Sequence, residues 1–206
     1  MTWRFLILLT SACLLLGAEK TERLNILVLG DSLAAGYGLD PSEAFPAILQ
    51  QKIDAAGLSY KVINAGASGD TSAGGLRRID WLLKQPIEIL IVELGGNDGL
   101  RGNAPKETKK NLEKIIDRSR EKYPHLKVVI AGMRMPANMG KDYTEQFEKI
   151  FSTLAKEKKA LLVPFLLEGV AGKRELNLPD RIHPTAEGQQ ILASNVWEIL
   201  KPILKK

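Results

Sequence analysis

Cysteine and histidine are scarce in this sequence of 206 residues. The one cysteine, Cys13, excludes an intramolecular disulfide and any metal cluster built on several cysteines. The chain also lacks an apolar run long enough for a bilayer. Its most apolar run, residues 5–16, has twelve residues and would rise only about 18 Å as a helix, against a hydrocarbon core of about 30 Å. With 45% apolar and 26% charged residues, the composition excludes disordered, collagen-like and polytopic membrane proteins and favours one folded domain.

Several ligand-binding signatures are absent as well. No Gly-x-Gly-x-x-Gly and no Walker-type Gly-Lys-Ser/Thr loop follows the first predicted strand. The net charge is +5, but acidic and basic residues alternate along the predicted helices instead of forming basic blocks. We therefore expect no nucleic-acid partner, and the missing phosphate-binding loops lead us to expect no cofactor.

The N-terminal segment has the layout of a secretory signal peptide. Arg4 supplies a positive charge, the apolar run at residues 5–16 follows, and Gly17-Ala18 precedes the first charged pair. We therefore predict a signal peptide at residues 1–18 and a single domain at residues 19–206. The protein is expected to be exported to the periplasm or secreted; the alternative is a buried first helix or an uncleaved anchor.

The cleavage site has two alternatives. Residues 9–13, LTSAC, resemble a bacterial lipobox, in which Cys13 would be lipidated and become the mature N-terminus, although Thr10 stands where that motif prefers leucine. Cleavage after Ala18 is favoured, although Leu16 is large for the −3 position. Membrane contact is expected only through a lipid on Cys13 or through a lipid substrate.

Short β-branched runs alternate with amphipathic helical patterns along the rest of the chain, which predicts a parallel sheet covered by helices. Thr185 is a plausible N-cap for the closing helix. The predicted strands are residues 25–29, 60–64, 87–94, 127–131 and 161–165. The fold class is therefore α/β with a five-stranded parallel sheet.

Polar residues stand at the ends of these strands, where ligands bind in open α/β sheets. Ser32 follows the first strand, Gly66 the second and Asn97 the third, and Asp180 and His183 precede the closing helix. Each short motif alone is also typical of a turn or a helix cap. Together they supply the parts of a serine hydrolase.

The chemistry assigns a role to each residue type. Serine is a weak nucleophile at its ordinary pKa, so His183 would take the proton of Ser32. Asp180, three residues earlier, would fix the tautomer of His183 and balance the imidazolium charge. The backbone N–H groups of Ser32 and Gly66 and the Asn97 amide could then stabilise the tetrahedral oxyanion.

In chain order, GDSL at residues 30–33, Gly66, GGND at residues 95–98 and DRIH at residues 180–183 resemble the four blocks of the SGNH (GDSL) hydrolases. The stretches at residues 69–75, 95–102 and 135–140 resemble the thioesterase I, arylesterase and lysophospholipase subgroup. The resemblance implies a flavodoxin-like three-layer α/β/α sandwich, no metal, and hydrolysis of acyl esters or thioesters through an acyl-serine. The mid-chain Gly-x-Ser-x-Gly elbow of the α/β-hydrolases does not occur here.

The neighbouring residues receive other interpretations. We expect Asp98 to cap its own turn and Glu93 to be a buried structural carboxylate that needs a partner. Met135 and Met139, in a methionine-rich loop, are candidate contacts for an acyl chain. The alternatives are a carbohydrate acetylesterase of the same fold and a non-catalytic flavodoxin-like binding module. We expect a small-molecule ester or thioester as the partner, and a monomer.

Overall fold

The computed structural model describes residues 23–205, so the predicted signal peptide and Cys13 lie outside the described residues. The β-strands are β1 (Leu24–Gly30), β2 (Tyr60–Gly66), β3 (Ile89–Glu93), β4 (Lys127–Ala131) and β5 (Leu161–Val163). The α-helices are α1 (Ser32–Ala35), α2 (Phe45–Ala55), α3 (Ser72–Leu82), α4 (Gly96–Leu100), α5 (Pro105–Lys122), α6 (Lys141–Glu157) and α7 (Ala186–Leu200). The 3₁₀-helices are η1 (Pro41–Glu43), η2 (Ala137–Met139), η3 (Arg174–Leu176) and η4 (Lys201–Ile203).

The five strands form one parallel sheet in the order β2-β1-β3-β4-β5. The strand order reverses between β1 and β3, because β1 pairs with β2 on one edge and with β3 on the other. The connections from β1 and β3 leave on opposite faces of the sheet, which opens a crevice at their carboxyl ends. The predicted α/β fold class is confirmed.

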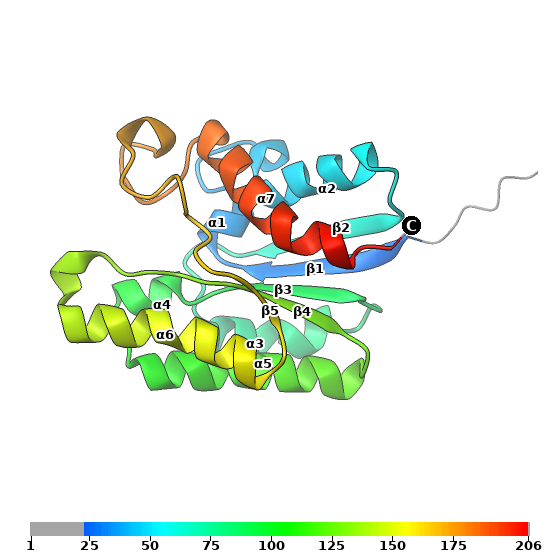
Figure 1. Ribbon diagram of the computed structural model, residues 1–206, viewed down its shortest axis with the longest axis horizontal. Helices are drawn as coiled ribbons and strands as arrows, with labels where there is room; N and C mark the ends of the chain where they lie inside the picture. Colours follow the sequence, from blue (N-terminus) through cyan, green and yellow to red (C-terminus); the bar gives the residue numbers. More distant parts are fainter. Residues whose placement is uncertain (1–22, 206) are drawn as a thin grey trace, which may run out of the picture.

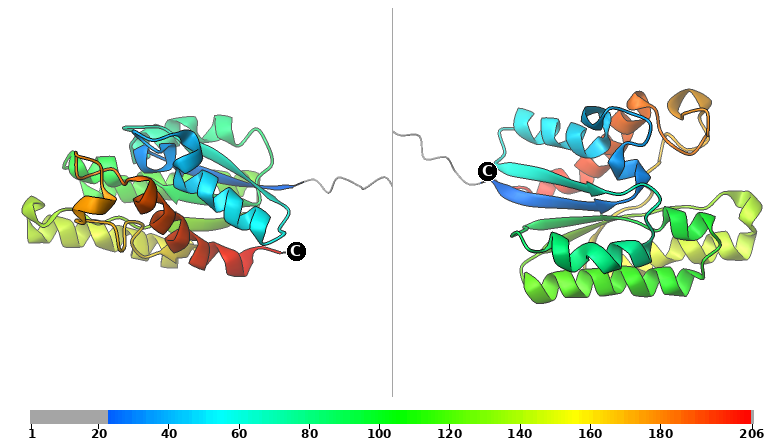
Figure 2. Two further views of the ribbon diagram at one scale, coloured as in Figure 1. Left: turned by 90° about the horizontal axis from the view of Figure 1, so that it is seen from above. Right: turned by 180° about the vertical axis from the view of Figure 1, so that it is seen from behind.

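Helices cover both faces of the sheet. In Figure 1, α1, α2 and α7 lie above the sheet and α3, α5 and α6 lie below it, and the view from behind in Figure 2 shows the same layers. Because both faces are covered, the central strands are apolar over most of their length: residues 26–29 of β1 and residues 89–91 of β3 have no exposed surface. The carboxyl ends of β1 and β3, and the loops that follow them, lie at the left-hand end of the sheet in Figure 1.

Local chemistry explains where the elements end. The strand predicted at residues 161–165 stops at Val163, because Pro164 has no N–H to donate to the neighbouring strand. The strand predicted at residues 87–94 ends at Glu93, two residues before Gly95 adopts a φ of +119°. Thr185 caps α7 as predicted, since its Oγ1 accepts the N–H of Gly188 at 3.3 Å.

The sequence patterns gave no clear sign of α3. Its third and fourth residues are Gly74 and Gly75, and glycine has a low helix propensity. A side chain at Gly75 would collide with Leu94, so the glycine lets α3 lie close to the sheet. Within residues 23–205, none of the helices combines the length and hydrophobicity that crossing a bilayer requires.

Candidate active site

The turn after β1 places Ser32 at the start of α1. Asp31 caps this helix, because its Oδ1 accepts the N–H of Leu33 at 3.0 Å. A Cβ atom at Gly30 would come within 2.5 Å of both Ala34 Cβ and Glu93 Oε2, so glycine is required for the tight turn. The strand, the glycine and the cap together fix the position of the Ser32 hydroxyl.

The structure brings Ser32, His183 and Asp180 together from opposite ends of the chain. His183 Nε2 lies 2.9 Å from Ser32 Oγ, and His183 Nδ1 lies 2.7 Å from Asp180 Oδ2. The ring of Tyr37 packs against the imidazole, with 4.3 Å between the ring centroids. The hydroxyl, imidazole and carboxylate therefore form the linear arrangement that general-base activation of a serine requires.

Asp180 is held in its ionised form. Burial raises its pKa, but hydrogen bonds from the backbone N–H and ring of His183 and from the N–H of Ile182 outweigh burial and lower the pKa of Asp180 to about 2. Its Oδ1 accepts the N–H groups of Ile182 and His183 at 2.9 and 3.0 Å. The carboxylate can therefore balance an imidazolium at His183 across the physiological pH range.

Asn97, at the start of α4, reaches the same end of the sheet. Its Nδ2 donates to Asp31 Oδ2 at 3.1 Å and to the backbone oxygen of Asp70 at 2.9 Å. The N–H of Ser32, by contrast, has no acceptor among residues 23–205. Asn97 and the Ser32 N–H thus remain candidate oxyanion donors, with the amide fixed by the loops on either side of it.

The prediction for Gly66 is wrong in this structure. The N–H of Gly66 donates to Asn64 Oδ1 at 2.9 Å, so it is not available to an oxyanion. Gly69, three residues later, has an N–H without an acceptor in the described part of the chain, and the next carbonyl, that of Asp70, accepts from the Asn97 amide. Gly66 and Gly69 lie in the same loop, and the sequence alone does not show which N–H is available to the oxyanion. The left-handed φ of +79° at Gly69 is seen only in the folded chain.

Two carboxyl groups are buried behind the nucleophile turn. Burial and the adjacent Asp31 raise the pKa of Glu93 well above its ordinary range, although the N–H groups of Asp31 and Ala34 oppose the shift. Burial likewise raises the pKa of Asp31 to about 6, against the hydrogen bonds from Leu33 and Asn97. Glu93 Oε2 accepts the Asp31 N–H at 3.0 Å, while Glu93 Oε1 has no partner within residues 23–205. Glu93 thus finds the partner it was expected to need on the chain segment that leads into Ser32.

The prediction that Asp98 caps its own turn is also wrong. Its carboxylate accepts the N–H and hydroxyl of Ser72 at 2.7 and 2.6 Å, and Thr108 Oγ1 lies 3.4 Å away. Asp98 therefore fastens the loop after β3 to the N-terminal end of α3 and to α5.

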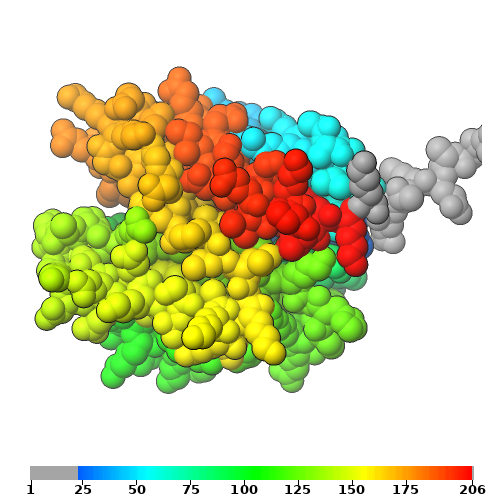
Figure 3. All heavy atoms as spheres, in the orientation of Figure 1, coloured from blue at the N-terminus to red at the C-terminus, as the bar shows by residue number. Residues whose placement is uncertain are grey.

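A pocket of about 610 Å³ opens beside Ser32 and His183, a volume typical of small-molecule sites. Figure 3 shows the molecule hollowed on the left, between the orange segment and the yellow-green segment. The polar lining includes Asn97 and Asn177. The apolar side chains that sequence reasoning did not assign to the site are Leu33, Leu100, Met133, Phe165, Leu167 and Ile182. For Leu100 and Ile182 the sequence did offer a signal, because both stand within the motif stretches at residues 95–102 and 180–183. In the structure these two apolar side chains are 46% and 49% exposed.

The two candidate methionines have different positions. Met135 lines the pocket, whereas Met139, in η2, is not among the lining residues. The prediction of a substrate contact at Met139 is therefore not supported by the structure, although Pro136, three residues before it, lines the pocket. Met133 lines the pocket in its place and is 4% exposed.

Arginines around the pocket have different partners. Arg134 pairs with Glu148 at 2.8 Å and with Glu168 at 3.6 Å, and its guanidinium lies over the ring of Phe165. Arg101 donates to the backbone oxygen of Gly69 at 3.0 Å, which braces the loop after β2. Both side chains therefore have structural contacts.

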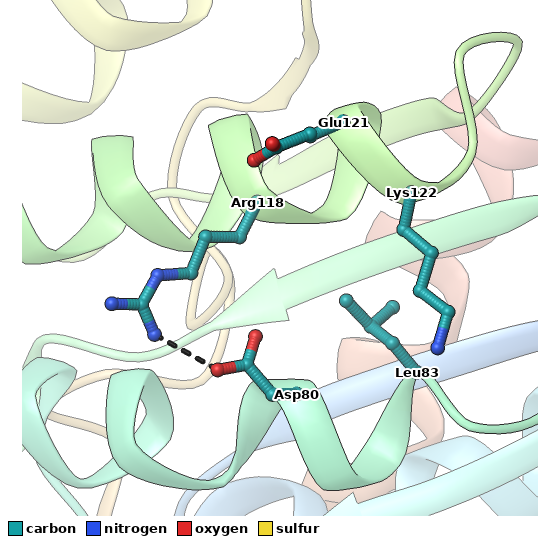
Figure 4. A pocket seen from close by; sticks show the side chains of 5 residues that line it. All are labelled: Asp80, Leu83, Arg118, Glu121 and Lys122. Carbon is teal, nitrogen blue, oxygen red and sulfur yellow. Dashed lines mark hydrogen bonds and ion pairs between the residues drawn. The ribbon is translucent and has the colours of Figure 1, made fainter.

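A second hollow, of about 410 Å³, lies between α3 and α5 and is shown in Figure 4. Asp80 and Arg118 form an ion pair of 3.0 Å across it, and Leu83, Glu121 and Lys122 complete the lining. It brings no nucleophile and base together. Among residues 23–205, no three histidine, cysteine, aspartate or glutamate side chains form a group that could hold a metal ion.

A serine–histidine–aspartate arrangement at the carboxyl edge of a five-stranded parallel sheet defines the class as a hydrolase acting on ester bonds. The chain belongs to the GDSL-like lipase/acylhydrolase family, whose family model matches residues 28–191.

The chain is similar to named proteins and to proteins of known structure. The chain is 42% identical to esterase TesA of Pseudomonas aeruginosa, over 96% of this chain and 98% of that protein. It is 40% identical to thioesterase 1/protease 1/lysophospholipase L1 of Escherichia coli K12, over 87% of this chain and 85% of that protein. A crystal structure of TesA superposes with a TM-score of 0.84 at 43% identity and covers 87% of this chain and 99% of that one.

Proposed function

We propose that this protein is a serine esterase that hydrolyses carboxylic esters and thioesters of acyl chains through an acyl intermediate on Ser32. The observation that carries the proposal is the continuous contact from Ser32 Oγ to His183 at 2.9 Å and from His183 to Asp180 at 2.7 Å. The names of the relatives, an esterase and a thioesterase/lysophospholipase, support the same range of substrates.

The reaction begins with proton transfer from Ser32 Oγ to His183 Nε2 as the oxygen attacks the substrate carbonyl carbon. Asp180, ionised because its pKa is about 2, stabilises the imidazolium. The oxyanion accepts the N–H groups of Ser32 and Gly69 and the Asn97 hydrogen that now reaches Asp31, the longer of its two contacts. His183 then donates its proton to the leaving alcohol or thiol, and water attacks the acyl-serine with the same base.

The mainly apolar lining of the pocket supports an acyl chain over an acetylated sugar. Leu167, Phe165 and Met135 face the space beside the nucleophile, and burial of an apolar chain there is favourable by about 25 cal/mol per Å². A carbohydrate acetylesterase would cleave an acetylated sugar faster than a longer acyl ester, so a panel of chain lengths and leaving groups distinguishes the two.

The test of the proposed function is hydrolysis by the purified protein of a p-nitrophenyl ester and an acyl thioester. Ser32→Ala is expected to lower kcat by several orders of magnitude for both substrates while the circular dichroism spectrum stays unchanged. Ser152→Ala is the matched control, since Ser152 is an exposed serine on α6 whose hydroxyl contacts only the Lys149 carbonyl oxygen within the described residues. Equal rates for Ser32→Ala and Ser152→Ala would refute the proposal.

We further propose that residues 1–18 direct export and that the favoured cleavage follows Ala18. Intact mass measurement of the protein from soluble and membrane fractions tests this. A soluble mature chain beginning at Glu19 supports the proposal, whereas a lipidated chain beginning at Cys13 assigns the lipoprotein alternative.

A further inference from the structure

Arg181 has a backbone conformation that side chains rarely adopt. Eleven described residues have a positive φ, and nine of them are glycines. The two exceptions are Lys159, with φ +48°, and Arg181, with φ +62°. Arg181 thus occupies a position where glycine would be less strained.

The turn that carries the catalytic base causes this conformation. Asp180 Oδ1 accepts the N–H groups of both Ile182 and His183, at 2.9 and 3.0 Å, and the chain between them closes tightly around the carboxylate. Arg181 is the residue of this turn that lies between Asp180 and Ile182. The turn itself explains the left-handed backbone but does not explain an arginine, since a glycine would make the same hydrogen bonds without the strain. Strained residues at functional sites point to a role for the side chain.

The Arg181 side chain belongs to the pocket. It lines the space beside Ser32 and His183 and is exposed to solvent. Among residues 23–205, no carboxylate lies within ion-pair distance of its guanidinium. The other arginine of the pocket lining, Arg134, is neutralised by two glutamates. Arg181 therefore supplies the uncompensated positive charge of the described lining.

The mechanism places the leaving group on this side of the pocket. His183 must protonate the departing oxygen or sulfur, so that atom lies beside His183 Nε2. Arg181 is two residues from His183 on the same turn, and it lines the same pocket. Charge on the leaving group would therefore meet the guanidinium, which can bind a phosphate in a bidentate manner.

We propose that Arg181 selects substrates whose leaving group carries a phosphate. This inference rests on the proposed function, since it assigns the leaving-group side of the same site. The phosphate can belong to a phosphopantetheine thiol or to a glycerophosphate headgroup, and the shared chemistry is a phosphate monoester on the leaving group, close to the scissile bond in the headgroup and farther from it in the thiol.

The test uses two pairs of substrates with one acyl chain, and each pair differs chiefly in the presence of phosphate. Dodecanoyl-4′-phosphopantetheine is compared with the neutral thioester dodecanoyl-pantetheine, and 1-dodecanoylglycerol 3-phosphate with 1-dodecanoylglycerol. Wild type, Arg181→Gln, Arg181→Lys and Arg181→Gly are assayed below the aggregation concentration of each substrate. Lys159→Gly is the matched control, because it relieves the same backbone strain and removes a cation at the opposite, amino-terminal edge of the sheet.

The expected result is a fall of about tenfold in kcat/KM for the phosphate-bearing substrates in Arg181→Gln and Arg181→Gly, the size expected for an exposed hydrogen bond between charged groups. The neutral substrates change less than twofold, Arg181→Lys retains most of the preference, and Lys159→Gly matches wild type throughout. A loss confined to the pantetheine pair assigns a phosphopantetheine thioester, and a loss confined to the glycerol pair assigns a lipid headgroup.

Two results would overturn the inference: an unchanged ratio within both pairs, or an equal fall for neutral and charged substrates in Arg181→Gly, which has no strain to disturb the turn. Failure of the proposed function is distinguishable, because wild type would then hydrolyse neither neutral substrate. Rapid hydrolysis of the neutral substrates with no effect of Arg181 contradicts only the phosphate assignment.

Discussion

Replacing Glu93 by glutamine should make the protein more stable at high pH without altering the nucleophile turn. Glu93 has no exposed surface, and its Oε2 accepts the N–H of Asp31 at 3.0 Å. Glutamine keeps an oxygen in that position but carries no ionisable proton. The variant therefore separates the hydrogen bond to the Ser32 turn from the burial of a titrating carboxyl group.

The direction and slope follow from the raised pKa of Glu93. Above the ordinary pKa of 4.5, the unfolded chain has released its proton while the folded chain still holds it. Between these two pKa values the free energy of unfolding falls by about 1.4 kcal/mol per pH unit. Asp31, whose pKa rises to about 6, adds a similar slope at lower pH in both proteins. Because the adjacent Asp31 raises the pKa of Glu93, the difference between wild type and Glu93→Gln reports the Glu93 contribution together with its interaction with Asp31.

Urea unfolding at intervals from pH 5 to pH 9 measures this difference. The stability of Glu93→Gln relative to wild type is expected to rise by about 1.4 kcal/mol per pH unit between the ordinary pKa of 4.5 and the raised pKa of Glu93. The extra amide donor of glutamine contributes an offset that does not depend on pH. Glu121→Gln, which removes an exposed carboxylate on α5, is the control with a flat difference curve. Parallel pH curves for wild type and Glu93→Gln would refute the burial of a neutral Glu93.

Three further predictions concern activity. Asn97→Ala is expected to lower kcat by roughly 10²- to 10³-fold in a folded protein, because one oxyanion donor is lost; a near wild-type kcat would remove Asn97 from the site. Asp180→Asn is expected to lower kcat by roughly 10⁴-fold, and since the pKa of Asp180 is about 2, its protonation should produce no limb in the wild-type pH–rate profile above pH 4. Met135→Asp is expected to shift the acyl-chain preference and Met139→Asp to leave it unchanged, because only Met135 lines the pocket; equal profiles for the two variants would contradict the assigned pocket.

The fold could be predicted from the sequence because the strands are rich in β-branched and apolar residues. The runs that became β1 and β3 are buried on both faces, and this burial makes them continuous apolar segments. Helix α3 escaped prediction because Gly74 and Gly75 weaken its helical signal, while its reason for being helical is close packing against the sheet. A contact between distant elements leaves no local pattern.

The same limit applies to the site. Ser32, Asp180 and His183 stand in recognisable short motifs, and the structure brings them into contact. The prediction that Gly66 is an oxyanion donor was wrong because its N–H already donates a hydrogen bond to the side chain of Asn64. Met139 lies in η2 and is not among the residues that line the pocket, whereas Met135 is. These errors concern where one N–H or one side chain points, which neighbouring residues determine only after folding.

Covalent labelling tests whether Ser32 is the nucleophile. The protein would be treated with a fluorophosphonate, digested, and the modified peptide sequenced by mass spectrometry. One adduct is expected, on Ser32 Oγ, that forms much more slowly in His183→Ala and is absent in Ser32→Ala. An adduct on another serine, or labelling that persists in Ser32→Ala, would contradict that role of Ser32.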